Sequence, residues 1–159
     1  KYTQSGAPPP AEPAPSTTPL PTTGAASHGK EMSDGAKTYY NAVSLFSQQK
    51  YDEALDEFKN IVNSAQEQEY GIKSLFEIGR CLHSLEKYDA CIKHYTTMIQ
   101  KYPKHPDLVD ALYYLGVCNE QQGDEGKATR FFKLILSKAT EDMPVHRRAR
   151  KALRNLTGS

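Results

Sequence analysis

Two cysteine–histidine pairs in the middle of the chain have the residue types of a zinc site. Cys81 is separated from His83 by one residue, and Cys91 from His94 by two. Structural zinc is held by four such sulfur and nitrogen ligands that converge on one point. The helical register described below argues against convergence, because Cys91 falls at a contact between two helices whereas His94 is expected to point away from it. We therefore predict no metal and no cofactor.

The three cysteines are interpreted instead as packing residues. Cys91 is predicted to be a buried small hydrophobic residue and Cys81 a partly buried one, with Cys118 repeating the role of Cys81. A metal- or thiol-based sensor is the alternative for these residues. Other catalytic motifs are absent from the sequence: it has no nucleophile elbow, no phosphate-binding glycine loop and no His–Glu metal motif. We predict that the protein is not an enzyme.

Charge and hydropathy argue against two further classes of function. The chain has 20 Lys and Arg against 19 Asp and Glu, a net charge of +1, which creates no overall field to attract nucleic acid. No run approaches the ~18 apolar residues of a membrane-spanning helix. Five basic residues and no acidic one lie between 144 and 159. We interpret them as the solvated face of a last helix, with contact to an acidic partner or to lipid headgroups as the alternative.

The first 33 residues differ in composition from the rest. Seven of the ten prolines lie between positions 8 and 21, among Ala, Ser and Thr. Such a segment cannot bury enough apolar surface to offset the entropy of ordering it, and its prolines favour an extended chain. We predict a disordered linker over 1–33, with a ligand for a proline-binding domain as the alternative. The chain starts at Lys1 with neither Met nor a signal peptide, so we expect an internal fragment or a processed product.

From residue 34 onward one pattern recurs every 37 residues. It consists of a small residue on a first helix, a small residue on a second helix and an aromatic residue one turn later: Ala42, Ala54 and Phe58, then Gly79, Cys91 and Tyr95, then Gly116, Ala128 and Phe132. Antiparallel helices approach closely only where their facing side chains are small, so we expect the two small residues of each unit to face each other. The aromatic residue is expected to reach into the next helical pair.

This pattern resembles the tetratricopeptide repeat (TPR). The second unit matches its signature at Leu75, Ile78, Gly79, Leu82, Cys91, Tyr95 and Pro103, and the third at Leu112, Leu115, Gly116, Ala128 and Phe132. The first unit matches less well, because Asn41 stands where an apolar residue is usual. The resemblance predicts an all-α, right-handed superhelical solenoid of three TPR hairpins. The predicted TPR domain spans 34–159, with repeats at about 35–71, 72–108 and 109–143 and a capping helix over 144–157.

The 37-residue spacing, longer than the usual 34, and the proline-rich linker resemble one envelope family in particular. This is the C-terminal TPR domain of the Tol–Pal system coordinator of bacterial cell division. The resemblance implies a periplasmic adaptor that coordinates cell-wall synthesis with outer-membrane constriction, with a Tol–Pal component as a candidate partner. Members of that family carry an N-terminal coiled coil, so oligomerisation through a region missing here is a further expectation.

The first helices of stacked hairpins line a concave groove, where a partner peptide or helix can bind. Projection from the small-residue register predicts ten groove residues: Tyr39, Val43, Phe46, Lys73, Phe76, Arg80, His83, Tyr113, Val117 and Glu120. Aromatic residues rimmed by Lys73 and Arg80 favour a ligand with acidic character. The alternative for several of them is packing between neighbouring repeats. The alternative function is a structural subunit or lipoprotein-like assembly factor of another envelope complex, such as outer-membrane protein assembly, pilus or secretion machinery, binding through its convex face or linker.

Overall fold

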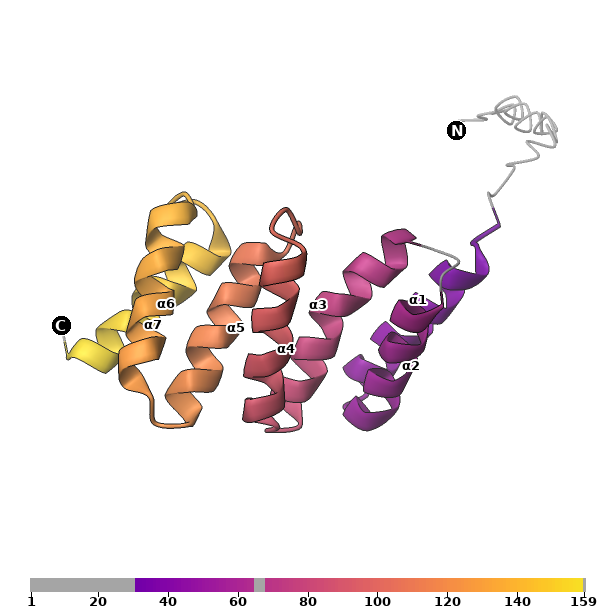
Figure 1. Ribbon diagram of the computed structural model, residues 1–159, viewed down its shortest axis with the longest axis horizontal. Helices are drawn as coiled ribbons and strands as arrows, with labels where there is room; N and C mark the ends of the chain where they lie inside the picture. The colour runs from indigo at the N-terminus through magenta and orange to yellow at the C-terminus, as the bar shows by residue number, and fades with distance from the viewer. Residues whose placement is uncertain (1–30, 65–67, 159) are drawn as a thin grey trace, which may run out of the picture. The chain divides into compact units, whose positions relative to one another are not determined.

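A computed structural model describes residues 31–64 and 68–158, and within these ranges the chain is all-α. Its helices are α1 (Asp34–Ser47), α2 (Tyr51–Asn63), α3 (Gln68–Ser84), α4 (Tyr88–Lys101), α5 (Leu108–Gln121), α6 (Glu125–Lys138) and α7 (Pro144–Thr157). They form a helical unit that begins at Met32 (Figure 1). The linker predicted over 1–33 lies outside the described residues, except for its last three.

Short turns with the same backbone conformation join the two helices of each hairpin. The residues at 49, 86 and 123 all have a positive φ, of 63°, 57° and 81°. In each turn the next residue donates its N–H to a carbonyl five residues back, for example Lys87 to Leu82 at 2.9 Å. This arrangement satisfies carbonyl groups at the end of the first helix and reverses the chain. Three equivalent turns therefore set the same hairpin geometry three times.

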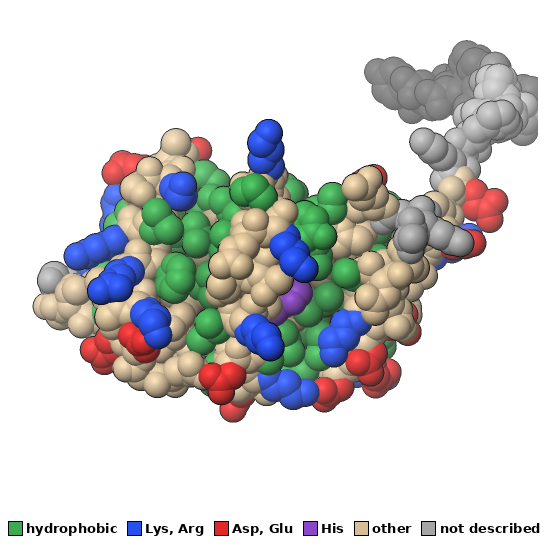
Figure 2. All heavy atoms as spheres, viewed as in Figure 1, with side chains coloured by type: hydrophobic (Ala, Val, Ile, Leu, Met, Phe, Trp, Pro, Cys, Tyr) green, Lys and Arg blue, Asp and Glu red, His purple; other side chains and the backbone are tan. Residues whose placement is uncertain are grey.

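Each hairpin packs on the next mainly through its second helix, α2 on α3 and α4 on α5, and the first helices also touch one another. Among the described helices, α1 contacts α3, α3 contacts α5 and α5 contacts α7, whereas α2, α4 and α6 do not contact one another. Helices that touch one another in this way lie on the inner side of a solenoid. Figure 2 shows one face of the unit, on which hydrophobic side chains reach the surface in bands between neighbouring helices. The all-α solenoid predicted from the 37-residue pattern is confirmed.

The contact between the two helices of a hairpin differs from the prediction in one respect. The Sγ of Cys91 does lie 3.6 Å from the backbone oxygen of Gly79. The space in front of Gly79, however, is filled by the ring of Tyr95. Tyr95 thus contacts the glycine of its own hairpin, because a residue four positions after the small one lies on the same helix face. The expected reach into the next helical pair is also present, since the Tyr95 ring stacks on Tyr114 of α5.

Candidate binding surface

The ten residues predicted to form a groove lie on α1, α3 and α5, and each is half-buried. We call the surface formed by these residues, together with Tyr40, Tyr70, Glu77, Tyr114, Arg148 and Lys151, the inner face. Half-burial means that every predicted side chain contacts its neighbours and still reaches solvent. The contacts between hairpins show how this surface is assembled.

The first and second hairpins meet through aromatic rings and one arginine. The ring of Tyr39 on α1 lies 5.4 Å from that of Tyr70 on α3. The guanidinium of Arg80 stacks 4.5 Å above the ring of Phe46. Tyr39 is sufficiently buried to raise the pKa of its hydroxyl to about 12, so it stays protonated. At this end of the inner face Tyr39 therefore presents an aromatic edge and a neutral hydroxyl group.

Tyr114 joins the second hairpin to the third. Its ring stacks on that of Tyr95 at 5.7 Å, with 19° between the planes. It also contacts Phe76 at 5.9 Å and His83 at 5.2 Å, both edge-on. These distances lie in the range of favourable aromatic pairs. Phe76 and His83 thus pack between neighbouring repeats, which is the structural alternative considered for them above.

Helices α5 and α7 line an open pocket of about 340 Å³. Arg148 of α7 stacks 4.7 Å above the ring of Tyr113 and pairs with Asp110 at 2.6 Å. The pocket is lined by Tyr113, Val117, Glu120, Arg148, Lys151, Ala152 and Asn155. Three predicted groove residues therefore share a concavity with the basic residues of the last helix.

The positive charges on α3 have partners within their own helix. Arg80 pairs with Glu77 at 2.9 Å, and Lys73 with Glu69 at 2.6 Å. Burial raises the pKa of Glu77, and the charge of Arg80 partly offsets that rise. The prediction that Lys73 and Arg80 form a basic rim for an acidic ligand is thus weakened, because both cations already pair with carboxylates. The two basic side chains that line the pocket come from α7, and one of them, Arg148, is itself paired with Asp110.

Several residues of the inner face were missed by the sequence analysis. Tyr40 is 51% exposed and contacts Tyr70, whose ring also lies 5.0 Å from Nζ of Lys73. Positions 40, 77 and 114 follow the same 37-residue register as the predicted residues and could have been found by extending it by one position. Arg148 could not, because α7 lacks the small-residue pattern that sets the register.

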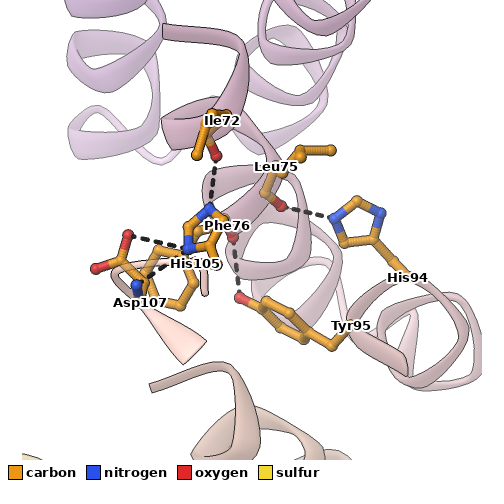
Figure 3. A network of polar contacts seen from close by, with 7 residues as sticks. All are labelled: Ile72, Leu75, Phe76, His94, Tyr95, His105 and Asp107. Carbon is orange, nitrogen blue, oxygen red and sulfur yellow. Dashed lines mark hydrogen bonds and ion pairs between the residues drawn. The ribbon is translucent and has the colours of Figure 1, made fainter. Parts of the chain in front are cut away.

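Polar contacts from α4 and from the loop after it also correct the expectation for His94. Figure 3 shows three side chains reaching backbone oxygens of α3. His94 Nε2 lies 2.6 Å from the oxygen of Leu75, Tyr95 donates its hydroxyl to Phe76 at 3.0 Å, and His105 Nε2 lies 2.7 Å from Ile72. His94 therefore points toward α3 and not away from it. A ring nitrogen facing a carbonyl must carry the hydrogen, so His94 is a donor here.

The thiol groups are more enclosed than expected. Cys81, like Cys91 and Cys118, is fully buried rather than partly buried. Over residues 31–64 and 68–158, no three His, Cys, Asp or Glu side chains gather in a way that could hold a metal ion. In the same ranges no helix has the length and apolar character needed to cross a membrane.

Comparison with known proteins supports the repeat assignment. The tetratricopeptide repeat family matches residues 73–105 and 110–139. No curated protein sequence matches the chain at a significant level. The TPR domain of Arabidopsis FLU, a solved structure, is similar with a TM-score of 0.58 and 17% identity, over 65% of this chain and 92% of that one.

Two secretion chaperones are similar in structure over a longer part of the chain. The type III secretion translocator chaperone SycD of Yersinia enterocolitica has a TM-score of 0.66 at 18% identity, covering 79% of this chain and 94% of its own. PcrH from Pseudomonas aeruginosa has a TM-score of 0.66 at 17% identity, covering 79% and 95%. At such identities the likeness concerns the fold. Residues 73–105 and 110–139 therefore match tetratricopeptide repeats, and they lie in an all-α solenoid whose fold these structures share.

Proposed function

We propose that the protein is a non-enzymatic scaffold whose inner face binds a peptide or a helix of a partner protein. One observation carries this proposal: aromatic side chains line the inner face from α1 to the pocket beside α7, and all ten predicted groove residues keep part of their surface in solvent. Aromatic and arginine side chains supply much of the energy at protein interfaces. A curved row of them suits an elongated ligand.

Complexes of similar proteins support a peptide ligand. SycD is known in complex with a peptide of the translocator YopD, and PcrH in complex with the chaperone binding regions of PopD and PopB. These TPR-like folds bind segments of other proteins. Because identity is below 20%, their particular partners are not transferred to this chain.

The chemistry of the inner face suggests how the ligand lies. Aromatic rings dominate on α1 and α3, where the two cations are already paired. Arg148 and Lys151 line the pocket at the other end. Arg148 pairs with Asp110, whereas Lys151 forms no ion pair within the described residues. We therefore infer a ligand with apolar anchor residues along α1 and α3 and an acidic group beside Lys151 at the α5–α7 pocket.

The biological setting belongs to this proposal as well. A periplasmic adaptor of the Tol–Pal system in cell division rests on the sequence resemblance alone, and the solved structures named above do not support it. The secretion chaperones among them favour the alternative, an assembly factor or subunit of another envelope or secretion complex. A peptide-binding inner face is compatible with both settings.

Photo-crosslinking in cells tests the proposal directly. A benzophenone amino acid is placed at Tyr40 or Tyr113 on the inner face, and at Leu134 on α6 as a control that is 38% exposed. We expect protein adducts from positions 40 and 113 that mass spectrometry assigns to one segment of a partner, and none of that segment from position 134. Adducts from position 134 alone would assign binding to the outer surface and contradict the proposal.

The captured segment, made as a synthetic peptide, then permits measurement of affinity. Replacing both Phe76 and Arg80 with Ala should weaken binding at least tenfold, or roughly 1.4 kcal/mol. Because Phe76 also packs on Tyr95 and Tyr114, Tyr40→Ala is the matched surface variant. It should weaken binding while the melting temperature stays close to that of the parent protein. Unchanged affinity in both variants would exclude the inner face as the binding surface.

A further inference from the structure

Two buried thiols meet where the second hairpin packs on the third. Cys118 on α5 directs its Sγ at the Sγ of Cys91 on α4, 2.9 Å away. Cys91 in turn lies 3.6 Å from the backbone oxygen of Gly79. Both cysteines are fully buried, so neither sulfur faces solvent. Cys81 is equally buried, but no sulfur contact involves it among the described residues.

We propose that Cys91 and Cys118 form a disulfide site that covalently joins the second hairpin to the third. A disulfide bond is about 2.05 Å long, so the two sulfurs need to approach each other by less than about 1 Å. The helices that carry them already pack side by side. The site is independent of the proposed ligand surface, because both thiols lie in the core between the hairpins.

The reaction is a thiol–disulfide exchange with an external disulfide such as oxidised glutathione. The thiolate of one cysteine attacks a sulfur of the oxidant, forms a mixed disulfide and expels one thiolate. The thiolate of the second cysteine attacks the protein sulfur of that mixed disulfide and expels the other. The two protons lost by the protein end on the two expelled thiols, so the oxidant takes up two electrons and the protein loses about 2 Da.

Burial determines when this exchange can occur. The contact with Cys118 and desolvation raise the pKa of the Cys91 thiol, so the folded protein holds it protonated and out of reach of an oxidant. Exchange must therefore happen while the α4–α5 contact is open, during folding or transient separation of the repeats. Neighbouring repeats of a solenoid are held by their shared interface, so a bond across it prevents their separation.

The sequence provides well-matched variants for a test. In the first and third repeats the position of Cys91 is occupied by Ala54 and Ala128, so Cys91→Ala inserts a residue that this fold already accepts. Cys81→Ala removes a thiol of equal burial that has no sulfur neighbour. Trypsin places the three cysteines on separate peptides, 81–87, 88–93 and 105–127.

The full chain is unfolded under reducing conditions, refolded with a mixture of oxidised and reduced glutathione, alkylated and digested. We expect peptide 88–93 linked to 105–127, with peptide 81–87 alkylated, in the parent and in Cys81→Ala. Cys91→Ala should abolish the link while circular dichroism shows the same helix content. In an unfolded chain the shorter loop would favour pairing of Cys81 with Cys91. A dominant 81–91 link, attached glutathione without an internal link, or no link at all would each overturn the proposal.

Discussion

The ring of Tyr95 on α4 lies against the backbone of Gly79 on α3, in the space that any side chain at position 79 would need. The third hairpin repeats the relationship: a Cβ added to Gly116 would lie 2.5 Å from Cε1 of Phe132. Real Cβ atoms do not approach ring carbons so closely. Both aromatic rings are fully buried, so they have little room to move aside.

Gly79→Ala should therefore destabilise the protein although alanine favours helices. We expect a loss of about 1–3 kcal/mol in the free energy of unfolding, as for other overpacked core positions. Gly116→Ala should behave in the same way against Phe132. The measurement is urea unfolding followed by circular dichroism.

Gly71→Ala provides the control for this prediction. Gly71 lies in the same helix as Gly79, and no atom lies within 4 Å of an added Cβ. At position 71 only the helix preference of alanine acts, so we expect the free energy of unfolding to rise by about 0.5–1 kcal/mol. Equal effects at positions 71 and 79 would show that the ring does not occupy the space in front of Gly79.

Tyr95→Phe isolates the hydroxyl group from the ring. The hydroxyl donates to the backbone oxygen of Phe76 at 3.0 Å, and its loss leaves the ring packing on Gly79 unchanged. We expect a loss of about 0.5–1.5 kcal/mol in the free energy of unfolding. Tyr40→Phe, whose side chain is half exposed, should change stability by much less. If the two substitutions cost the same, the buried hydrogen bond contributes nothing.

The turns that divide the hairpins yield a third prediction. Gln49 and Glu86 adopt a positive φ that Gly123 adopts in the third hairpin. This conformation costs a residue with a side chain about 1 kcal/mol. Glu86→Gly should therefore stabilise the protein by up to about 1 kcal/mol, and Gly123→Ala should destabilise it by a similar amount.

Thermal melts of both turn variants measure these changes. Gly126→Ala is the comparison for position 123, because Gly126 lies within α6 and an added Cβ would meet nothing closer than 3.7 Å. If Gly126→Ala destabilises the protein as much as Gly123→Ala, the positive φ at position 123 is not the cause of the lower stability.

The 37-residue spacing was sufficient to predict an all-α stack of three hairpins. Residues that recur at one position of each helix must pack in the same way in each repeat, so the spacing alone predicts the stacked arrangement. What the spacing could not reveal was which of two residues covers the glycine. Cys91 and Tyr95 are four apart and share one helix face, so both come within reach of Gly79, and only the side-chain conformation of Tyr95 decides where the ring lies.

For the inner face, too, the spacing predicted which residues take part but not how closely they pack. Its ten predicted residues follow from the register, and all of them reach the surface in part. How far Arg80 and Phe46 bury each other depends on the angle at which neighbouring hairpins stack, which no pattern within one repeat specifies. The direction of His94 could have been inferred, since it stands three residues after the buried Cys91 and so lies near the same face.

Stability should fall on mild acidification, because two histidines are partly buried. Burial lowers the pKa of His94 and of His83 below their ordinary value of about 6.5. Between the lowered and the ordinary pKa, the unfolded chain holds more protons than the folded one, so the free energy of unfolding rises with pH. The stability contributed in this way is complete above about pH 6.5 and is lost as the pH falls through that value.

The measurement compares urea unfolding at pH 7.5 and 5.5. His94→Gln keeps an N–H that can reach the oxygen of Leu75 but cannot titrate, so the difference between the two pH values should shrink in this variant. The range ends at pH 5.5 because burial raises the pKa of Glu77, which adds stability at lower pH and opposes the histidines. If His94→Gln and His83→Gln each retain the whole pH dependence of the parent protein, burial of these rings is not its source.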